Sequence, residues 1–243
     1  MQYELLFIAG IILIAFFYAS VGHGGASGYL ALMALFGLAP DSIRFNALIM
    51  NMFVSGIAFI SYYRAGYFKY RLVLPFLVGS IPFAYIGAQI IINPTVYKIL
   101  LGIFLLIAVI RILFVKTGQG IPIHKPPIYL ALGIGSVLGL ISGIIGIGGG
   151  ILLSPILILA RYANTKEASA ASAFFILLNS ASGLAGLPSQ SVDIQPHLVY
   201  WIAAVMCAGF IGASIGSRSF SEYKLKLVLS FVLLAASLKL FFY

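Results

Sequence analysis

The chain has 243 residues, of which 62% are hydrophobic and only 8% are charged, and its mean hydropathy is +1.13. Soluble domains carry roughly 25% charged residues, so this composition excludes a water-facing surface over most of the chain. Since roughly 20 apolar residues make one membrane crossing, we expect a polytopic integral membrane protein whose solvent is the lipid bilayer.

Ten hydrophobic elements follow one another and nearly exhaust the length of the chain. We place them at residues 3–21, 26–39, 42–63, 71–92, 96–115, 128–146, 149–162, 166–187, 197–216 and 222–242. The second and seventh are short, and each follows a cluster of glycines. The first is interpreted as a retained helix rather than a signal peptide, because Glu4 is its only early charge and the glycines after it recur later.

The two halves of the sequence repeat each other. Four matches occur in the same order, at offsets that grow slowly from 124 to 127 residues. They pair Gly22–Ala26 with Gly146–Gly150, Ile86–Ile90 with Ile211–Ile215, Tyr97–Lys98 with Tyr223–Lys224, and Phe104–Ala108 with Phe231–Ala235. We interpret this as an internal duplication, with a first membrane repeat at 1–116, a connecting loop at 117–127 and a second repeat at 128–243.

The basic residues predict the orientation of these elements. If all ten cross the membrane, eleven basic residues fall on one side and three on the other; if the two short elements do not cross, the split is seven and seven. The side with eleven holds Arg64, Lys69, Arg71, Arg111, Lys116, Lys125, Arg161, Lys166, Arg218, Lys224 and Lys226. The positive-inside rule therefore favours ten crossings, with both termini extracytoplasmic.

Ten crossings from two copies mean five in each copy, and an odd number forces the second copy to insert upside down. The predicted fold class is therefore an all-α integral membrane protein with two inverted-topology repeats of five elements. Such repeats are typical of secondary transporters, whose substrate site lies near the membrane midplane between the repeats.

Charge and composition also exclude other partners. The net charge of +9 does not indicate nucleic acid, because the basic residues are scattered at segment ends. Cys207 is the only cysteine, which excludes an internal disulfide and a cysteine metal cluster. We expect neither a metal nor another cofactor.

The glycine clusters predict two broken helices. Consecutive glycines interrupt a helix, and each cluster precedes a short element. The N-terminus of that element carries about half a positive charge and unpaired N–H groups, which an anion can approach closely where side chains are absent. In an inverted repeat the two N-termini can meet near the midplane and form an anion site. The alternative is that the glycines serve close helix packing.

The second cluster continues as Gly146-Ile147-Gly148-Gly149-Gly150-Ile151-Leu152-Leu153-Ser154-Pro155, which resembles the glycine-rich signature of the TauE/SafE sulfite-exporter family. The resemblance covers essentially the whole chain. It implies a multi-pass inner-membrane protein that moves sulfite or small organosulfonates. The first cluster departs from the signature, with His23 and Ala26 in it and Ser27-Gly28-Tyr29 after it.

Two cationic side chains are candidates for contact with a small anionic substrate. Arg44 lies a few residues into the third element, and its guanidinium can bind an oxyanion with two N–H groups. Alternatively, Arg44 is an interfacial side chain that extends to the headgroups beside Asp41. His23 can pair with an anion or carry a proton, or it can be a hydrogen-bonded packing residue.

Polar side chains also recur at helical spacing on the two elements that follow the short ones. Asn51 and Ser55 lie on the third element, and Ser169, Ser172 and Asn179 on the eighth. They line a solvated path or make ordinary interhelical hydrogen bonds. The predicted substrate-binding residues are therefore Gly22, His23, Gly24, Gly25, Ser27, Arg44, Asn51, Gly146, Gly148, Gly149, Gly150, Ser172 and Asn179.

The five acidic residues all fall at or near segment ends. If transport is coupled to a proton, His23 or the substrate itself must carry it. The leading hypothesis is a carrier for a small anion by alternating access, and a passive channel or a non-transporting assembly protein are the alternatives. An enzyme is not expected, because the three histidines lie in separate segments and show no metal-ligand spacing. Both a monomer and a homo-oligomer are compatible with the sequence.

Overall fold

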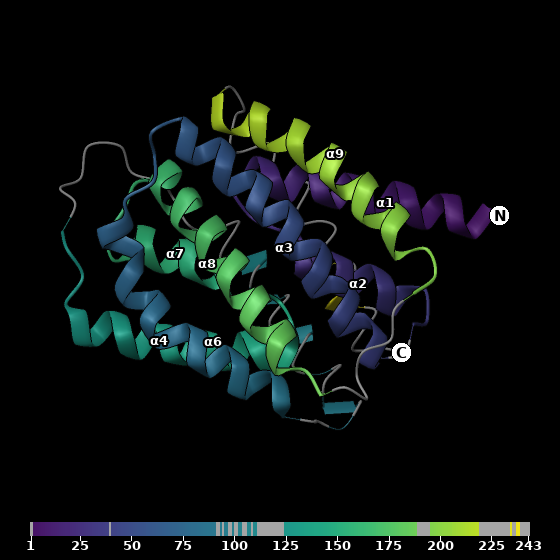
Figure 1. Cartoon of the computed structure of the whole chain (residues 1–243), viewed down its shortest axis with the longest axis horizontal. Coiled ribbons are helices and arrows are strands. Elements are labelled where there is room, and N and C mark those ends of the chain that lie inside the picture. The colour runs from purple at the N-terminus through teal and green to yellow at the C-terminus, as the bar shows by residue number, and fades with distance from the viewer. Residues whose placement is uncertain are drawn as a thin grey trace.

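The computed structural model describes residues 2–38, 40–90, 124–188 and 195–218, with isolated positions between 93 and 110 and between 234 and 238. The described residues form helices and no strands, as predicted (Figure 1). The helices are α1 (Gln2–Ser20), α2 (Ala26–Leu35), α3 (Pro40–Arg64), α4 (Tyr70–Gln89), α6 (Ile128–Ile145), α7 (Gly150–Leu159), α8 (Thr165–Gly186) and α9 (Leu198–Arg218). The predicted elements at 96–115 and 222–242 lie largely outside the described residues.

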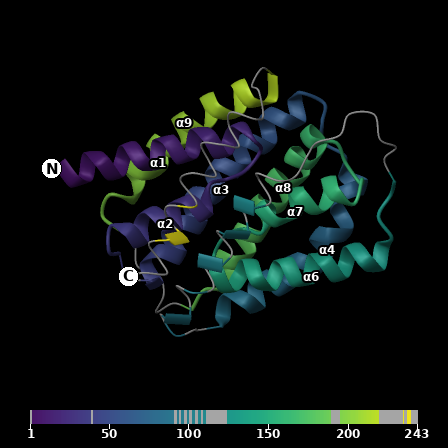
Figure 2. The same ribbon diagram turned by 180° about the vertical axis from the view of Figure 1, so that it is seen from behind.

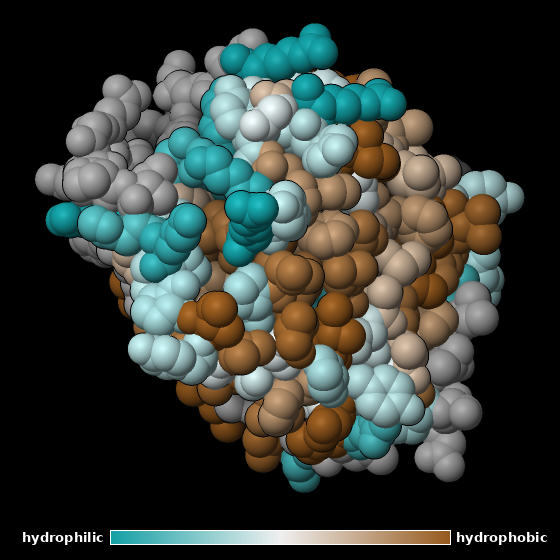
Figure 3. Space-filling model, turned by 60° about the vertical axis from the view of Figure 1, so that its left-hand side comes forward, coloured by the Kyte–Doolittle hydropathy of each residue, from teal (hydrophilic) through white to brown (hydrophobic). Residues whose placement is uncertain are grey.

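Five of the described helices are long and apolar enough to cross a membrane: α3 from residue 42, α4, α6, α8 and α9. Their outer faces carry large exposed hydrophobic side chains, for example Val78 on α4, Tyr129 on α6 and Phe210 on α9. Figure 3 shows a broad hydrophobic surface on one side of the molecule. The prediction of an integral membrane protein is confirmed in this form, with α2 and α7 as the shortened helices.

Helices α3 and α8 pack against each other at the centre of the molecule, and the other helices surround them. α4 packs on α6 and on α8, while α9 packs on α1 and on α3. The short helix α2 lies against α3, and α7 lies against α8. Figures 1 and 2 show α1 beside α9 and α4 beside α6 from opposite sides. Both short helices are therefore held against the central pair.

Glycines bring α4 and α6 into direct backbone contact. A Cβ atom at Gly135, Gly139 or Gly143 of α6 would collide with the carbonyl groups of Phe76, Ser80 and Ala84 of α4, respectively. The contacts advance by four residues on both helices, so α4 and α6 run parallel. Gly212 and Gly216 of α9 meet the carbonyls of Phe16 and Ser20 of α1 in the same way. Small residues thus set the spacing of both pairs.

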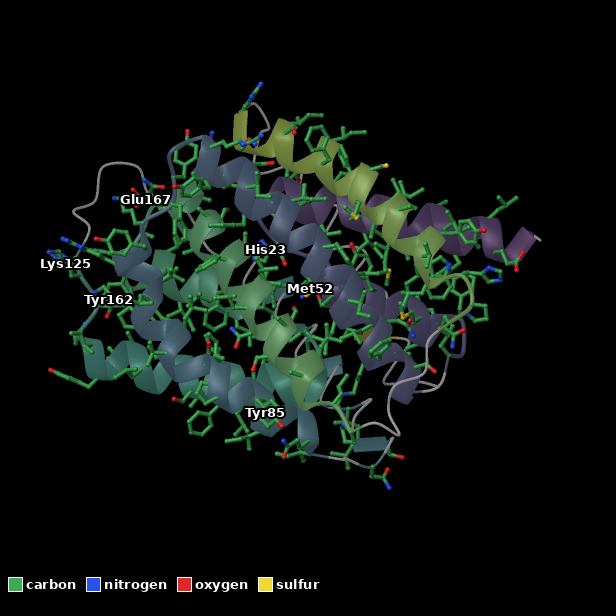
Figure 4. The ribbon with its side chains drawn as sticks, viewed as in Figure 1. His23, Met52, Tyr85, Lys125, Tyr162 and Glu167 are labelled. Atoms are coloured by element: carbon green, nitrogen blue, oxygen red, sulfur yellow. The ribbon has the colours of Figure 1, made fainter. Side chains whose placement is uncertain are left out.

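One end of the molecule gathers the polar connections. Lys69, which precedes α4, forms an ion pair with Glu167 in the first turn of α8. Lys166 Nζ donates to the Ser217 carbonyl at the end of α9, 2.8 Å away, and the His124 amide before α6 donates to the Arg161 carbonyl. Figure 3 shows hydrophilic side chains over this end, and Figure 4 places Lys125, Tyr162 and Glu167 there.

The other basic residues that were predicted to share one side either lie at this end or fall outside the residues that the structure describes. Arg64 ends α3, Arg71 lies in the first turn of α4, and Arg218 ends α9. Because Lys69, Lys166 and Ser217 join these helix ends, all three arginines belong to the same end. Arg111, Lys116, Lys224 and Lys226 lie outside the described residues.

Arg44 joins three helices near the start of α3. Its side chain is buried, and Nη2 donates to the Ala88 carbonyl of α4 at 3.1 Å and to the Gly143 carbonyl of α6 at 2.9 Å. Both carbonyls lie in the last turns of their helices, where carbonyls lack intrahelical partners and the helix dipole is negative. Arg44 therefore holds the C-terminal ends of α4 and α6 together.

Replacing Gly139 by alanine is expected to destabilise the protein, because the added methyl group collides with the Ser80 backbone. Overpacking of this kind costs about 1–3 kcal/mol. Gly133 is the matched control on the same helix: nothing lies within 4 Å of its Cβ position, so Gly133→Ala should be neutral or slightly stabilising. Thermal unfolding in detergent measures both variants, and equal melting temperatures would contradict the packing described here.

Replacing Arg44 by alanine is expected to lower stability, because two buried carbonyls lose a charged donor, at about 1–3 kcal/mol for each. Arg64→Ala is the control, since Arg64 is exposed at the polar end. Melting temperatures in detergent compare the two. If Arg44→Ala melts like wild type but has lost anion binding, Arg44 is a ligand of the anion and not a structural side chain.

Candidate functional site

The candidate site is built around the two non-helical segments that precede the short helices, which we call breaks. α1 ends at Ser20 and α2 begins at Ala26, while α6 ends at Ile145 and α7 begins at Gly150. The N-cap residues, Gly25 with φ of 98° and Gly149 with φ of 70°, are in the left-handed region and provide no side-chain cap. Glycine adopts this conformation without strain, so each short helix starts with bare backbone.

Asn51 of α3 lies between the two breaks. Its Oδ1 accepts a hydrogen bond from the Ala26 amide at the start of α2, 3.0 Å away, and its Nδ2 donates to Ser180 Oγ of α8 at 2.9 Å. Gly24 and Gly148 both abut the Asn51 amide, since a Cβ on either would clash with it. One buried side chain thus contacts both glycine clusters and the facing central helix.

His23 extends from the first break into the second half of the chain. Its Nδ1 lies 2.9 Å from the Val21 carbonyl, and its Nε2 lies 3.2 Å from Ser154 Oγ of α7. Ser154 Oγ lies 2.6 Å from Ser172 Oγ of α8. Because a carbonyl only accepts, Nδ1 carries a hydrogen, and in the neutral ring Nε2 accepts from Ser154. Figure 4 places His23 near the middle of the molecule.

The other cluster glycines allow α8 to approach closely. A Cβ on Gly22 would clash with Ser169, and a Cβ on Gly150 would clash with Ile176 and approach the Ser172 carbonyl. The clusters therefore also serve close packing, which was the alternative interpretation of these glycines. Close packing and a glycine-capped helix start therefore occur together at each break, and both helix starts are buried.

Four predicted site residues have other surroundings. Ser27 Oγ pairs with Tyr18 Oη of α1 at 2.8 Å. Arg44 donates to the helix ends of α4 and α6, and Gly146 lies beside its side chain. Asn179 donates from Nδ2 to the Phe175 carbonyl of its own helix. The structure thus gathers Gly22, His23, Gly24, Gly25, Asn51, Gly148, Gly149, Gly150 and Ser172 around the breaks.

Sequence reasoning missed two side chains that connect this region. Ser154 of α7 is hydrogen-bonded to His23, and Ser180 of α8 accepts a hydrogen bond from Asn51. Ser154 lies inside the glycine-rich stretch, one turn after Gly150, and Ser180 follows Asn179. The spacing of polar residues along α8 was the available signal, but it did not identify which hydroxyl meets which partner.

A separate cleft of about 380 Å³ lies at the end of the molecule where the chain starts. Glu4 and Phe7 of α1, Phe36 after α2, and His197 and Trp201 at the start of α9 line it. None of the predicted site residues belongs to its lining. The cleft and the polar connections therefore occupy different ends of the described structure.

Comparisons with known proteins place the chain in a family. A family model described as "Sulfite exporter TauE/SafE" matches residues 6–240. Probable membrane transporter protein y4hK of Sinorhizobium fredii is 36% identical over 231 residues, which cover 93% of this chain and 94% of that protein. YunE of Bacillus subtilis, also named a probable membrane transporter protein, is 25% identical over 74% of this chain and 72% of its own length.

A probable membrane transporter protein of Methanocaldococcus jannaschii is 29% identical, over 76% of this chain and 74% of that protein. No solved structure matches the chain. The family expected from the glycine-rich stretch is confirmed, and the chain belongs to the sulfite exporter TauE/SafE family of membrane transporters.

Proposed function

We propose that this protein carries a small anion, sulfite or an organosulfonate, across the cell inner membrane by alternating access between two inverted five-helix repeats. The observation that carries the proposal is the meeting of two glycine-capped helix starts, one from each half, at Asn51. The family description names sulfite, which supports the choice of a sulfur oxyanion as substrate.

The charge of the helix ends favours an anion. Each helix N-terminus carries about half a positive charge, and Gly24 and Gly148 bring the starts of α2 and α7 to opposite sides of the Asn51 amide. An ion there meets backbone donors that glycine leaves uncovered. His23, Ser154 and Ser172 add polar groups beside the same breaks. Transporters that use broken helices bind anionic groups in this way.

The packing of the helices supports inverted repeats. The main helix contacts occur in matching pairs: α4 on α6 matches α9 on α1, α4 on α8 matches α9 on α3, and α7 on α8 matches α2 on α3. α1 and α6 run in opposite directions in Figure 1. An exchange of the two halves about an axis between α3 and α8 accounts for all of these pairs.

Purified protein in liposomes is expected to take up labelled sulfite saturably, with competition from methanesulfonate and taurine. Preloading the liposomes with unlabelled sulfite should accelerate uptake, because a carrier that alternates exchanges faster than it returns empty. Uptake without this acceleration would indicate a channel instead. If folded, inserted protein takes up no sulfur oxyanion, the proposed substrate is wrong.

The Asn51→Asp variant is expected to lose most sulfite uptake, at least tenfold, because it places an isosteric carboxylate between the two helix starts. Asn164→Asp is the matched control: Asn164 caps α8 in the polar end by accepting from the Glu167 amide, and aspartate caps equally well. Uptake by both variants in liposomes, at equal reconstitution, tests the location of the anion. Equal uptake by the two variants would show that the anion does not bind beside Asn51.

The basic end is expected to face the cytoplasm. In a Cys207→Ser background, a cysteine at Lys125 should react with a membrane-impermeant maleimide only after the cells are permeabilised. A cysteine at His197, which lines the cleft at the opposite end, should react in intact cells. The reverse labelling pattern would invert the assignment, and labelling of both positions in intact cells would contradict a membrane-spanning arrangement.

A further inference from the structure

Two buried hydroxyl groups beside the helix starts have no hydrogen-bond partner among the described residues. They are Tyr29 Oη, in a side chain that is fully buried, and Ser142 Oγ, in a side chain that is 1% exposed. Tyr29 belongs to α2 and Ser142 to the last turn of α6. One such hydroxyl therefore accompanies the break in each half of the chain.

Each hydroxyl lies against the N-cap glycine of a short helix. A Cβ atom on Gly25 would be 2.8 Å from Tyr29 Oη, and a Cβ atom on Gly149 would be 3.3 Å from Ser142 Cβ. Helical side chains lean toward the N-terminus, which takes the Tyr29 ring back over the start of its own helix. Ser142 is held at the other break, where its carbonyl accepts from the Gly146 amide.

An unpartnered buried hydroxyl is unfavourable for folding, whereas an apolar side chain of the same shape avoids the loss. Phenylalanine at position 29 would keep the buried ring, and alanine at position 142 would keep the buried Cβ, in each case without the hydroxyl. Nearby hydroxyls in the same protein are partnered: Tyr18 with Ser27, and Tyr62 with the Ser20 carbonyl. Two exceptions, one beside the N-cap glycine of each short helix, indicate groups that are kept for a ligand.

We propose that Tyr29 and Ser142 donate hydrogen bonds to two different oxygens of the bound anion, so that the site selects an oxyanion over a halide. The inference rests on the proposed anion site and adds its selectivity. A sulfite or sulfonate group presents three oxygens around one sulfur, and each can accept from a hydroxyl and from backbone N–H groups. A chloride ion accepts all of its hydrogen bonds at one centre, so it can bind both hydroxyls only if they converge on a single point, whereas the oxygens of a sulfite or sulfonate group are spread around the sulfur.

The test uses Tyr29→Phe and Ser142→Ala, with Tyr62→Phe and Ser136→Ala as matched controls whose hydroxyls have partners. The rise in melting temperature with sulfite, methanesulfonate or chloride is titrated in detergent. We expect each test variant to bind sulfite and methanesulfonate about tenfold more weakly, as a lost hydrogen bond to a charged group implies. Chloride binding should be weak in wild type and unchanged in the variants.

The ligand-free proteins provide the second readout. Tyr29→Phe and Ser142→Ala should melt at or above the wild-type temperature, since no partner is lost. Tyr62→Phe should melt lower and bind sulfite normally. A lower ligand-free melting temperature for the test variants, or sulfite binding as tight as in wild type, would overturn the roles of Tyr29 and Ser142. If sulfite does not shift the melting temperature of the wild-type protein, the proposed anion site itself is wrong.

Discussion

The hydrocarbon core of a membrane offers no hydrogen bonds, so every backbone N–H and C=O within it needs a partner from the protein. Among the described residues a helix is interrupted before α2 and before α7, which leaves backbone groups that lipid could not satisfy. Asn51 reaches the start of α2, and Arg44 reaches the C-terminal turn of α6 just ahead of the second break. The central position of α3 follows from this demand, because α3 carries both side chains.

Glycine, which lacks a side chain, has two different roles in this protein. At Gly25 and Gly149 it permits the left-handed conformation that starts a short helix. On α6 and α9 it permits backbone contact with α4 and α1. These contacts join a helix from one half to a helix from the other. If access alternates, the pair α4–α6 and the pair α1–α9 each have to move as one body. The helix contacts that rearrange must then be those made by side chains.

Much of the fold was predictable, because apolar length and glycine breaks are local properties. The starts of α2 and α7 follow from Gly25 and Gly149, whereas both helices end a few residues earlier than predicted. The spacing of the basic residues predicted that those in the described part of the chain, apart from Arg44, share one end of the molecule. The partners of Arg44, Ser27 and Ser154 were not predictable, since they depend on which helices lie side by side. A polar residue on a membrane helix shows that a partner exists, and the sequence does not say which one.

The surroundings of Arg44 also bear on how a carrier can release its substrate. A buried guanidinium that faces an anion in a low dielectric binds it strongly, and tight binding slows release on the far side. Here Arg44 Nη2 donates to the Ala88 and Gly143 carbonyls, while the breaks present partial charges on backbone and neutral hydroxyls. Such groups recognise an oxyanion through the directions of its hydrogen bonds more than through its total charge. If the proposed anion site lies at the breaks, its affinity would fall once the two helix starts separate, as alternating access requires.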